Sequence, residues 1–181
     1  KIIIPEESQK NYSEKIIYLP NSYQPNDPTK KISNKIFTKE EFDLPKESFV
    51  FCNFNQSYKI NPYVFDAWMK ILEKVQNSVL WLLEDNPFTI QNIKNEANKR
   101  NIKPDRIIFA KELDLHDHLA RHKLADLFID TFPYTAHTTC SDALWSNLPV
   151  LTRMGKTFAS RVAGSLLTSI DLKELITNSE T

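Results

Sequence analysis

Residues 48–84 read SFVFCNFNQSYKINPYVFDAWMKILEKVQNSVLWLLE. The runs 48–54 and 78–84 are almost continuously apolar and have the length of strands, whereas apolar residues recur with a helical period over 61–75. An Asn-Pro pair at the start of that helical stretch supplies a capping side chain and a first-turn proline. A buried strand, a helix and a second buried strand in this order are typical of a βαβ unit, so the stretch predicts a parallel sheet covered by helices.

The same alternation continues toward the end of the chain. Further strands are predicted at 106–110, 126–131 and 149–152. Helices are predicted at 88–100, 115–123, from about Thr138 onward, at 156–169 and, as a short one, at 171–176. Five strands separated by helices indicate an α/β domain with a doubly wound, Rossmann-like parallel sheet.

The first part of the chain has a different composition. Residues 1–46 are rich in Asn, Pro, Ser and Lys and are interpreted as a loop or linker, interrupted by strand-like runs at 1–4 and 15–20. The regular alternation occupies 47–181. Because the sequence starts without Met and stops just after a short helical pattern, we expect a piece of a longer protein.

Charge and hydropathy exclude several classes of protein. Lys+Arg and Asp+Glu both number 23, which argues against a nucleic-acid binder that works by bulk charge. The sequence has no run of about 18 apolar residues, so no membrane span is expected. It has no basic-then-apolar leader, so secretion has no support. The two separated cysteines, Cys52 and Cys140, fit a reducing cytoplasm, where we expect the protein.

In a doubly wound sheet, ligands bind beyond the carboxyl ends of the strands. Three polar segments follow predicted strands: 53–62, 110–121 and 131–142. The chain has only two glycines, so neither a G-x-G-x-x-G motif nor a P-loop is possible. A phosphate bound here would need helix N–H groups, hydroxyls and a lysine instead.

The third segment offers that combination at the start of a helix. Thr138 and Thr139 lie where free N–H groups and the positive end of the helix dipole meet, and Asp142 follows one turn later on the same side, where it could bind a ribose diol. A simpler alternative is that Thr138 caps the helix and that the Asp142 carboxylate interacts favourably with the helix dipole. Gln56 and Lys59 lie in the first segment, and the lysine could neutralise a pyrophosphate, although a lone lysine is usually a solvated surface residue.

Histidines raise the question of a metal. His118 and His122 have i, i+4 spacing, but no H-E-x-x-H motif and no acidic third ligand accompanies them. No D-x-D motif is present to hold a divalent ion on a sugar nucleotide. We therefore expect neither a metal nor another cofactor.

Two blocks of residues carry a resemblance to a known family: N-F-N-Q-x-x-K at 53–59 and H-T-T-x-x-D-x-L-W at 137–145. From about Pro20 to Ile176 the chain resembles the C-terminal catalytic half of the O-linked N-acetylglucosamine transferase family, which includes SPINDLY-type proteins and bacterial relatives with TPR repeats. The resemblance implies a GT-B-type enzyme with two Rossmann-like lobes. It implies metal-independent, inverting transfer of N-acetylglucosamine from UDP-GlcNAc to Ser or Thr of acceptor proteins.

The resemblance also divides the chain and assigns roles. It implies that 1–46 is the end of an N-terminal lobe with the interlobe linker, and that 47–181 is the nucleotide-sugar-binding lobe without its last helices, inactive by itself and of bacterial, cytoplasmic origin. Lys59 is the implied catalytic residue, stabilising the departing UDP. The implied donor-binding residues are Gln56 and the triad His137, Thr138 and Thr139 at the diphosphate, Asp142 at the ribose, His118 and Arg121 at the uracil, and Leu113.

Two departures from the animal enzymes leave the donor open. Leu115 and Tyr134 stand where those enzymes have a lysine and a cysteine. The alternatives are the same fold with another donor, such as GDP-fucose, or a degenerate module that binds proteins without catalysis.

Overall fold

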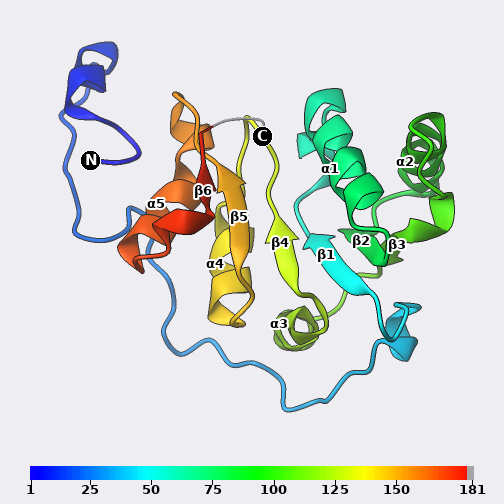
Figure 1. Ribbon diagram of the computed structural model, residues 1–181. Coiled ribbons are helices and arrows are strands. Elements are labelled where there is room, and N and C mark those ends of the chain that lie inside the picture. The colour runs from blue at the N-terminus through cyan, green and yellow to red at the C-terminus, as the bar shows by residue number, and fades with distance from the viewer. Residues whose placement is uncertain (179–181) are drawn as a thin grey trace.

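A parallel sheet forms the centre of the computed structural model, which describes residues 1–178 (Figure 1). Within this range six strands pair in the order β3-β2-β1-β4-β5-β6, and every pairing is parallel. The strands are β1 (Phe49–Asn53), β2 (Ser78–Leu83), β3 (Ile107–Ala110), β4 (Leu127–Ile129), β5 (Val150–Arg153) and β6 (Ile176–Thr177). The predicted doubly wound α/β class is confirmed.

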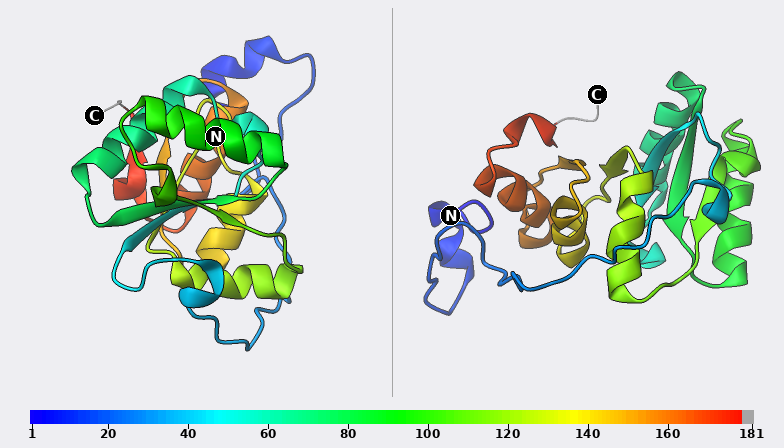
Figure 2. Two further views of the ribbon diagram at one scale, coloured as in Figure 1. Left: turned by 90° about the vertical axis from the view of Figure 1, so that its right-hand side faces the viewer. Right: turned by 90° about the horizontal axis from the view of Figure 1, so that it is seen from below.

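Helices cover both faces of the sheet (Figure 2, left). The helices are α1 (Pro62–Lys74), α2 (Pro87–Lys99), α3 (Leu115–Arg121), α4 (Thr138–Trp145) and α5 (Val162–Ser169). Helices α1 and α2 each start with an Asn-Pro pair, and the Asn61 and Asn86 side chains accept the N–H groups of Val64 and Thr89. The predicted capping at 61–62 is therefore confirmed.

Alternation along the strands divides the core between the two faces. Phe51 and Leu80 pack with α1 and α2, whereas Val50, Cys52 and Trp81 pack on the side of α4 and α5. Both cysteines are free and buried, and burial raises their pKa values, so they serve as small apolar core residues.

Four predicted elements differ from the structure, and two of them lie near the end of the chain. The helix predicted at 156–169 is a 3₁₀ turn, Phe158–Ser160, followed by α5, because Thr157 and Ser160 form a capping box that closes the first turn. The short helix predicted at 171–176 is a 3₁₀ turn, Lys173–Leu175, that leads directly into β6. Strand β6 has only two residues, which is too short to form a recognisable apolar run in the sequence.

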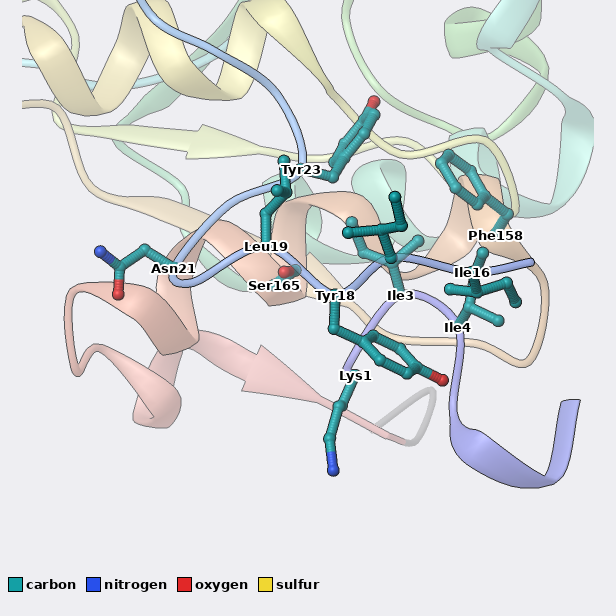
Figure 3. A pocket seen from close by; sticks show the side chains of 11 residues that line it. Lys1, Ile3, Ile4, Ile16, Tyr18, Leu19, Asn21, Tyr23, Phe158 and Ser165 are labelled. Carbon is teal, nitrogen blue, oxygen red and sulfur yellow. The ribbon is translucent and has the colours of Figure 1, made fainter. Parts of the chain in front are cut away.

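The strand predictions at 1–4 and 15–20 are wrong, since these residues have no strand pairing and lie on either side of a 3₁₀ helix, Glu6–Asn11. Ile3 is buried and lines a pocket with Tyr18, Leu19 and Phe158 next to α5 (Figure 3), whereas Ile17 and Leu19 are largely exposed. Within residues 1–178 no helix has the length and apolar character needed to cross a membrane.

Residues 20–37, which we call the crossing segment, run along the outside of α4 and α3 before the chain enters the sheet (Figure 2, right). Contacts tie the segment to both helices. Lys30 pairs with Asp142 of α4, and the Lys31 carbonyl contacts His116 of α3.

Candidate functional site

The order of the strands fixes where a ligand can bind. Strands β1 and β4 are neighbours, and the chain leaves them toward opposite sides of the sheet, which makes this the topological switch point of the fold. The loops after these strands, 54–61 and 130–137, meet there. Asn55 donates to the Thr131 hydroxyl at 3.1 Å, and Lys59 donates to the Thr135 carbonyl at 3.1 Å.

The three polar segments predicted from the sequence therefore adjoin one another. The second, 110–121, reaches the same edge through His118, whose ring centroid lies 5.2 Å from that of Phe54 in the first segment.

Lys59 ends a 3₁₀ turn, Ser57–Lys59, at this edge. Its ammonium nitrogen lies 3.1 Å from the Thr135 carbonyl oxygen, 3.4 Å from Asn55 Oδ1 and 4.0 Å from the centre of the Tyr134 ring. Partial burial lowers the pKa of Lys59, while the carboxylate of Asp130 acts in the opposite direction. The Lys59 ammonium has three N–H donors, and among the described residues two acceptors use two of them. The third donor remains for an anionic ligand.

Gln56 precedes this turn. Its carbonyl accepts the N–H of Lys59 at 3.1 Å, and its side chain is exposed. The structure thus places Gln56 beside Lys59, at the same edge, with an amide free to turn toward a ligand.

Helix α4 begins without a side-chain cap. His137 is the N-cap residue, with φ −109° and ψ −91°, and it makes no capping hydrogen bond; Thr138 is the first helical residue. The simpler alternative that Thr138 caps the helix is therefore wrong. The first N–H groups of α4 have no side-chain acceptor, so they are suited to an anion at the positive end of the helix dipole.

The two threonines of α4 differ in their partners. Thr139 donates to Asn55 Oδ1 at 2.6 Å, which fixes the start of α4 to the loop after β1. The hydroxyl of Thr138 accepts from Gln24 of the crossing segment at 3.0 Å. Burial lowers the pKa of His137, so its imidazole is neutral at pH 7.

His118 is held as a neutral ring. Burial lowers its pKa to about 3, with Arg121 adding to the effect. The nitrogen Nδ1 of His118 lies 2.6 Å from the Arg121 guanidinium. Because arginine can only donate, Nδ1 accepts and Nε2 carries the proton.

Arg121 is fully buried behind His118 and also donates to the Lys111 carbonyl. In this structure it positions the histidine, and its own contact with a base stays a prediction. Leu113, half-buried in the loop between β3 and α3, has an apolar side chain and would contribute packing and backbone groups.

Asp142 lies one turn into α4 and is mostly buried. Its Oδ1 atom is 2.6 Å from the ammonium of Lys30, a partner that the sequence did not reveal. Among residues 1–178 no three His, Cys, Asp or Glu side chains gather closely enough to hold a metal ion.

Asp130, at the end of β4, is a site residue that sequence reasoning missed. Its carboxylate is buried and accepts hydrogen bonds from the Thr131 N–H at 2.7 Å, the Ala136 N–H at 2.8 Å and the Thr152 hydroxyl at 2.7 Å. These bonds fold loop 130–137 around the carboxylate. The available signal was an acidic residue directly after a buried strand.

Burial raises the pKa of Asp130 to about 6 from 3.8, against the hydrogen bonds that it accepts. A folded-state pKa above the unfolded one means that the group stabilises the fold fully at low pH and loses this contribution as pH rises to about 6. We expect the difference in unfolding free energy between wild type and Asp130→Asn to fall from pH 4 to pH 6 and to be level above. Urea denaturation at several pH values measures it, and a difference that grows with pH would contradict the assignment.

Comparisons with known proteins identify the family of the chain. The family model described as "Glycosyl transferase family 41" matches residues 25–181. A protein of Arabidopsis thaliana named "Probable UDP-N-acetylglucosamine--peptide N-acetylglucosaminyltransferase SEC" is 37% identical over 160 residues, covering 86% of this chain and 16% of the relative. A Caenorhabditis elegans protein named "UDP-N-acetylglucosamine--peptide N-acetylglucosaminyltransferase" is 40% identical over 139 residues, covering 77% and 12%.

Among solved structures, a mutant of Thermobaculum terrenum O-GlcNAc transferase superposes with a TM-score of 0.87 at 28% identity, over 99% of this chain and 34% of that one. The likeness confirms the predicted Rossmann-like lobe of a GT-B-type glycosyltransferase. The chain spans less than a fifth of the length of the two curated relatives. The family model covers most of the chain, and the chain belongs to glycosyl transferase family 41.

Proposed function

We propose that this chain is the donor-binding lobe of a protein that transfers N-acetylglucosamine from UDP-GlcNAc to Ser or Thr hydroxyls of other proteins. One observation carries the proposal. The uncapped start of α4 lies at the switch point, with Lys59 and Asp142 placed around it by separate elements. The names of the relatives, which are transferases for UDP-N-acetylglucosamine, support the choice of donor.

Each part of the nucleotide has a complementary group. The diphosphate would bind the first N–H groups of α4, the hydroxyls of Thr138 and Thr139, and the ammonium of Lys59. The Asp142 carboxylate would accept hydrogen bonds from the ribose hydroxyls. The neutral face of His118 would stack on the uracil, with Gln56 and His137 beside the phosphates and Leu113 near the base.

The proposed reaction is a direct displacement. The acceptor hydroxyl oxygen forms a bond to the anomeric carbon as the bond from that carbon to the phosphate oxygen breaks, which inverts the configuration. The electron pair of the broken bond leaves with UDP, and the hydroxyl proton passes to a base outside the described residues. Lys59 stabilises the charge that develops on the departing phosphate, and with the helix N-terminus it takes the role that a divalent ion has in other transferases.

We expect the chain to bind UDP in the presence of EDTA, because the phosphate charge is met by protein groups alone. Isothermal titration with UDP, with GDP as the competing nucleotide, tests this. We expect UDP to bind about tenfold or more tightly than GDP, as one well-matched set of polar contacts with the base commonly gives.

Other results would change the proposal. Binding that appears only after Mg²⁺ or Mn²⁺ is added would contradict the metal-independent mechanism. Tighter binding of GDP would favour a guanosine-linked donor. A chain that binds neither nucleotide would favour a module without catalysis.

A further inference from the structure

We propose that Lys30 of the crossing segment is a positioning residue, which holds the Asp142 carboxylate in place for a ribose. The inference rests on the proposed function and adds a residue to it. It makes nucleotide binding depend on a segment that lies outside the sheet and its helices.

The contact between the two side chains is close and shielded from water. Lys30 Nζ lies 2.6 Å from Asp142 Oδ1, and the side chains are only 18% and 10% exposed. A buried carboxylate without a partner is strongly disfavoured, so Lys30 compensates the charge of Asp142. The ammonium engages Oδ1, and a carboxylate has about four lone-pair directions, so acceptor capacity remains on Oδ2 for a hydroxyl group.

The backbone around Lys30 is itself fixed. The Trp145 indole N–H, on the last residue of α4, donates to the Lys30 carbonyl at 3.1 Å. On the α3 side, the Lys31 carbonyl lies 2.7 Å from His116 Nδ1, and the Ser33 N–H donates to the His116 carbonyl at 3.1 Å. A lysine on a tethered backbone can hold a carboxylate in one orientation, which a free surface lysine cannot.

The tether joins the two helices that the proposed function needs. Helix α4 carries Asp142 and helix α3 carries His118, and the crossing segment contacts both on their outer side (Figure 2, right). Gln24, earlier in the segment, also donates to Thr138 at the start of α4. The segment therefore sets the spacing between the groups proposed for ribose and base.

The test compares two nucleotides that differ only at the ribose, UDP and 2′,3′-dideoxy-UDP. Their dissociation constants are measured by isothermal titration for the wild-type chain, Lys30→Met, Lys30→Arg and Lys31→Met. We expect Lys30→Met to weaken UDP binding about tenfold, as loss of a charged hydrogen-bonding partner commonly does, and to leave the dideoxy nucleotide almost unchanged. Lys30→Arg should keep most of the preference for ribose, and Lys31→Met, at an exposed neighbouring side chain, should keep all of it.

Four results would overturn the inference. Equal weakening of both nucleotides would show that Lys30 only supports the fold. Tighter UDP binding by Lys30→Met would show that Lys30 competes with the ribose. A preference for ribose that survives unchanged in Lys30→Met would overturn this inference alone, whereas a wild-type chain that binds neither nucleotide would overturn the proposed function as well.

Discussion

Lys59→Met is expected to lower the turnover of the whole enzyme by about a hundredfold or more, with a much smaller effect on UDP affinity. The ammonium is held at a fixed place by the Thr135 carbonyl and the Tyr134 ring. Negative charge grows on the departing phosphate as the bond to the sugar breaks, so the ammonium interacts more strongly with the transition state than with the bound donor. Methionine keeps the apolar stem over Tyr134 and removes only the charge.

Steady-state transfer to a protein acceptor with varied UDP-GlcNAc measures this effect. Asp142→Asn is the contrasting variant, because a bond to the ribose is the same before and during the reaction, so its loss should raise the Michaelis constant of the donor. Near-normal turnover in Lys59→Met with a raised Michaelis constant would mean that Lys59 is a binding charge and not a catalytic one.

Asp130→Ala is expected to lower the free energy of unfolding by about 3 kcal/mol or more, since each buried donor left without an acceptor is worth about 1–3 kcal/mol. The side chain accepts from two backbone N–H groups and the Thr152 hydroxyl, and all three donors would lose their partner. The same loss frees loop 130–137, so UDP affinity should fall with stability.

Urea denaturation and UDP titration of the same variants test this pair of effects. Asp126→Ala is the matched control. Asp126 lies just before the start of β4, and its carboxylate accepts one backbone N–H, that of Val50, at 2.7 Å. It should lose less stability and keep its UDP affinity. An Asp130→Ala protein as stable as Asp126→Ala would show that the buried network contributes little.

The sequence was most informative where local pattern and tertiary environment agree. Strands β1 and β2 are buried on both faces, so their apolar runs were easy to recognise, and α1 has both a helical period and a cap. Prediction failed at 1–4 and 15–20, because apolar character alone does not supply a strand partner: Ile3 and Ile4 join the core without pairing, and Ile17 and Leu19 stay largely exposed. It failed again within 156–169, because a capping box at Thr157 and Ser160 starts a separate turn that hydrophobicity does not reveal.

The candidate site shows the same division. Lys59, Thr138 and Asp142 could be proposed from their types and from their places after predicted strands. The partners that hold them could not, because they are distant in sequence: Lys30 and Asp142 are 112 residues apart, and Asn55 and Thr139 are 84 apart. Only the fold brings such pairs together, and a lysine in an irregular segment carries no local signal of its partner.

The network around Asn55, Asp130 and Thr139 has a further consequence for how a phosphate group would be bound. A glycine-rich loop gains access to phosphate through a flexible backbone, which must be ordered when the ligand arrives. Here the glycines, Gly155 and Gly164, lie outside loops 54–61 and 130–137, and hydrogen bonds within the protein join those loops to each other and to the start of α4. The conformational entropy of the loops is thus already lost on folding, so more of the interaction energy with a nucleotide would appear as affinity.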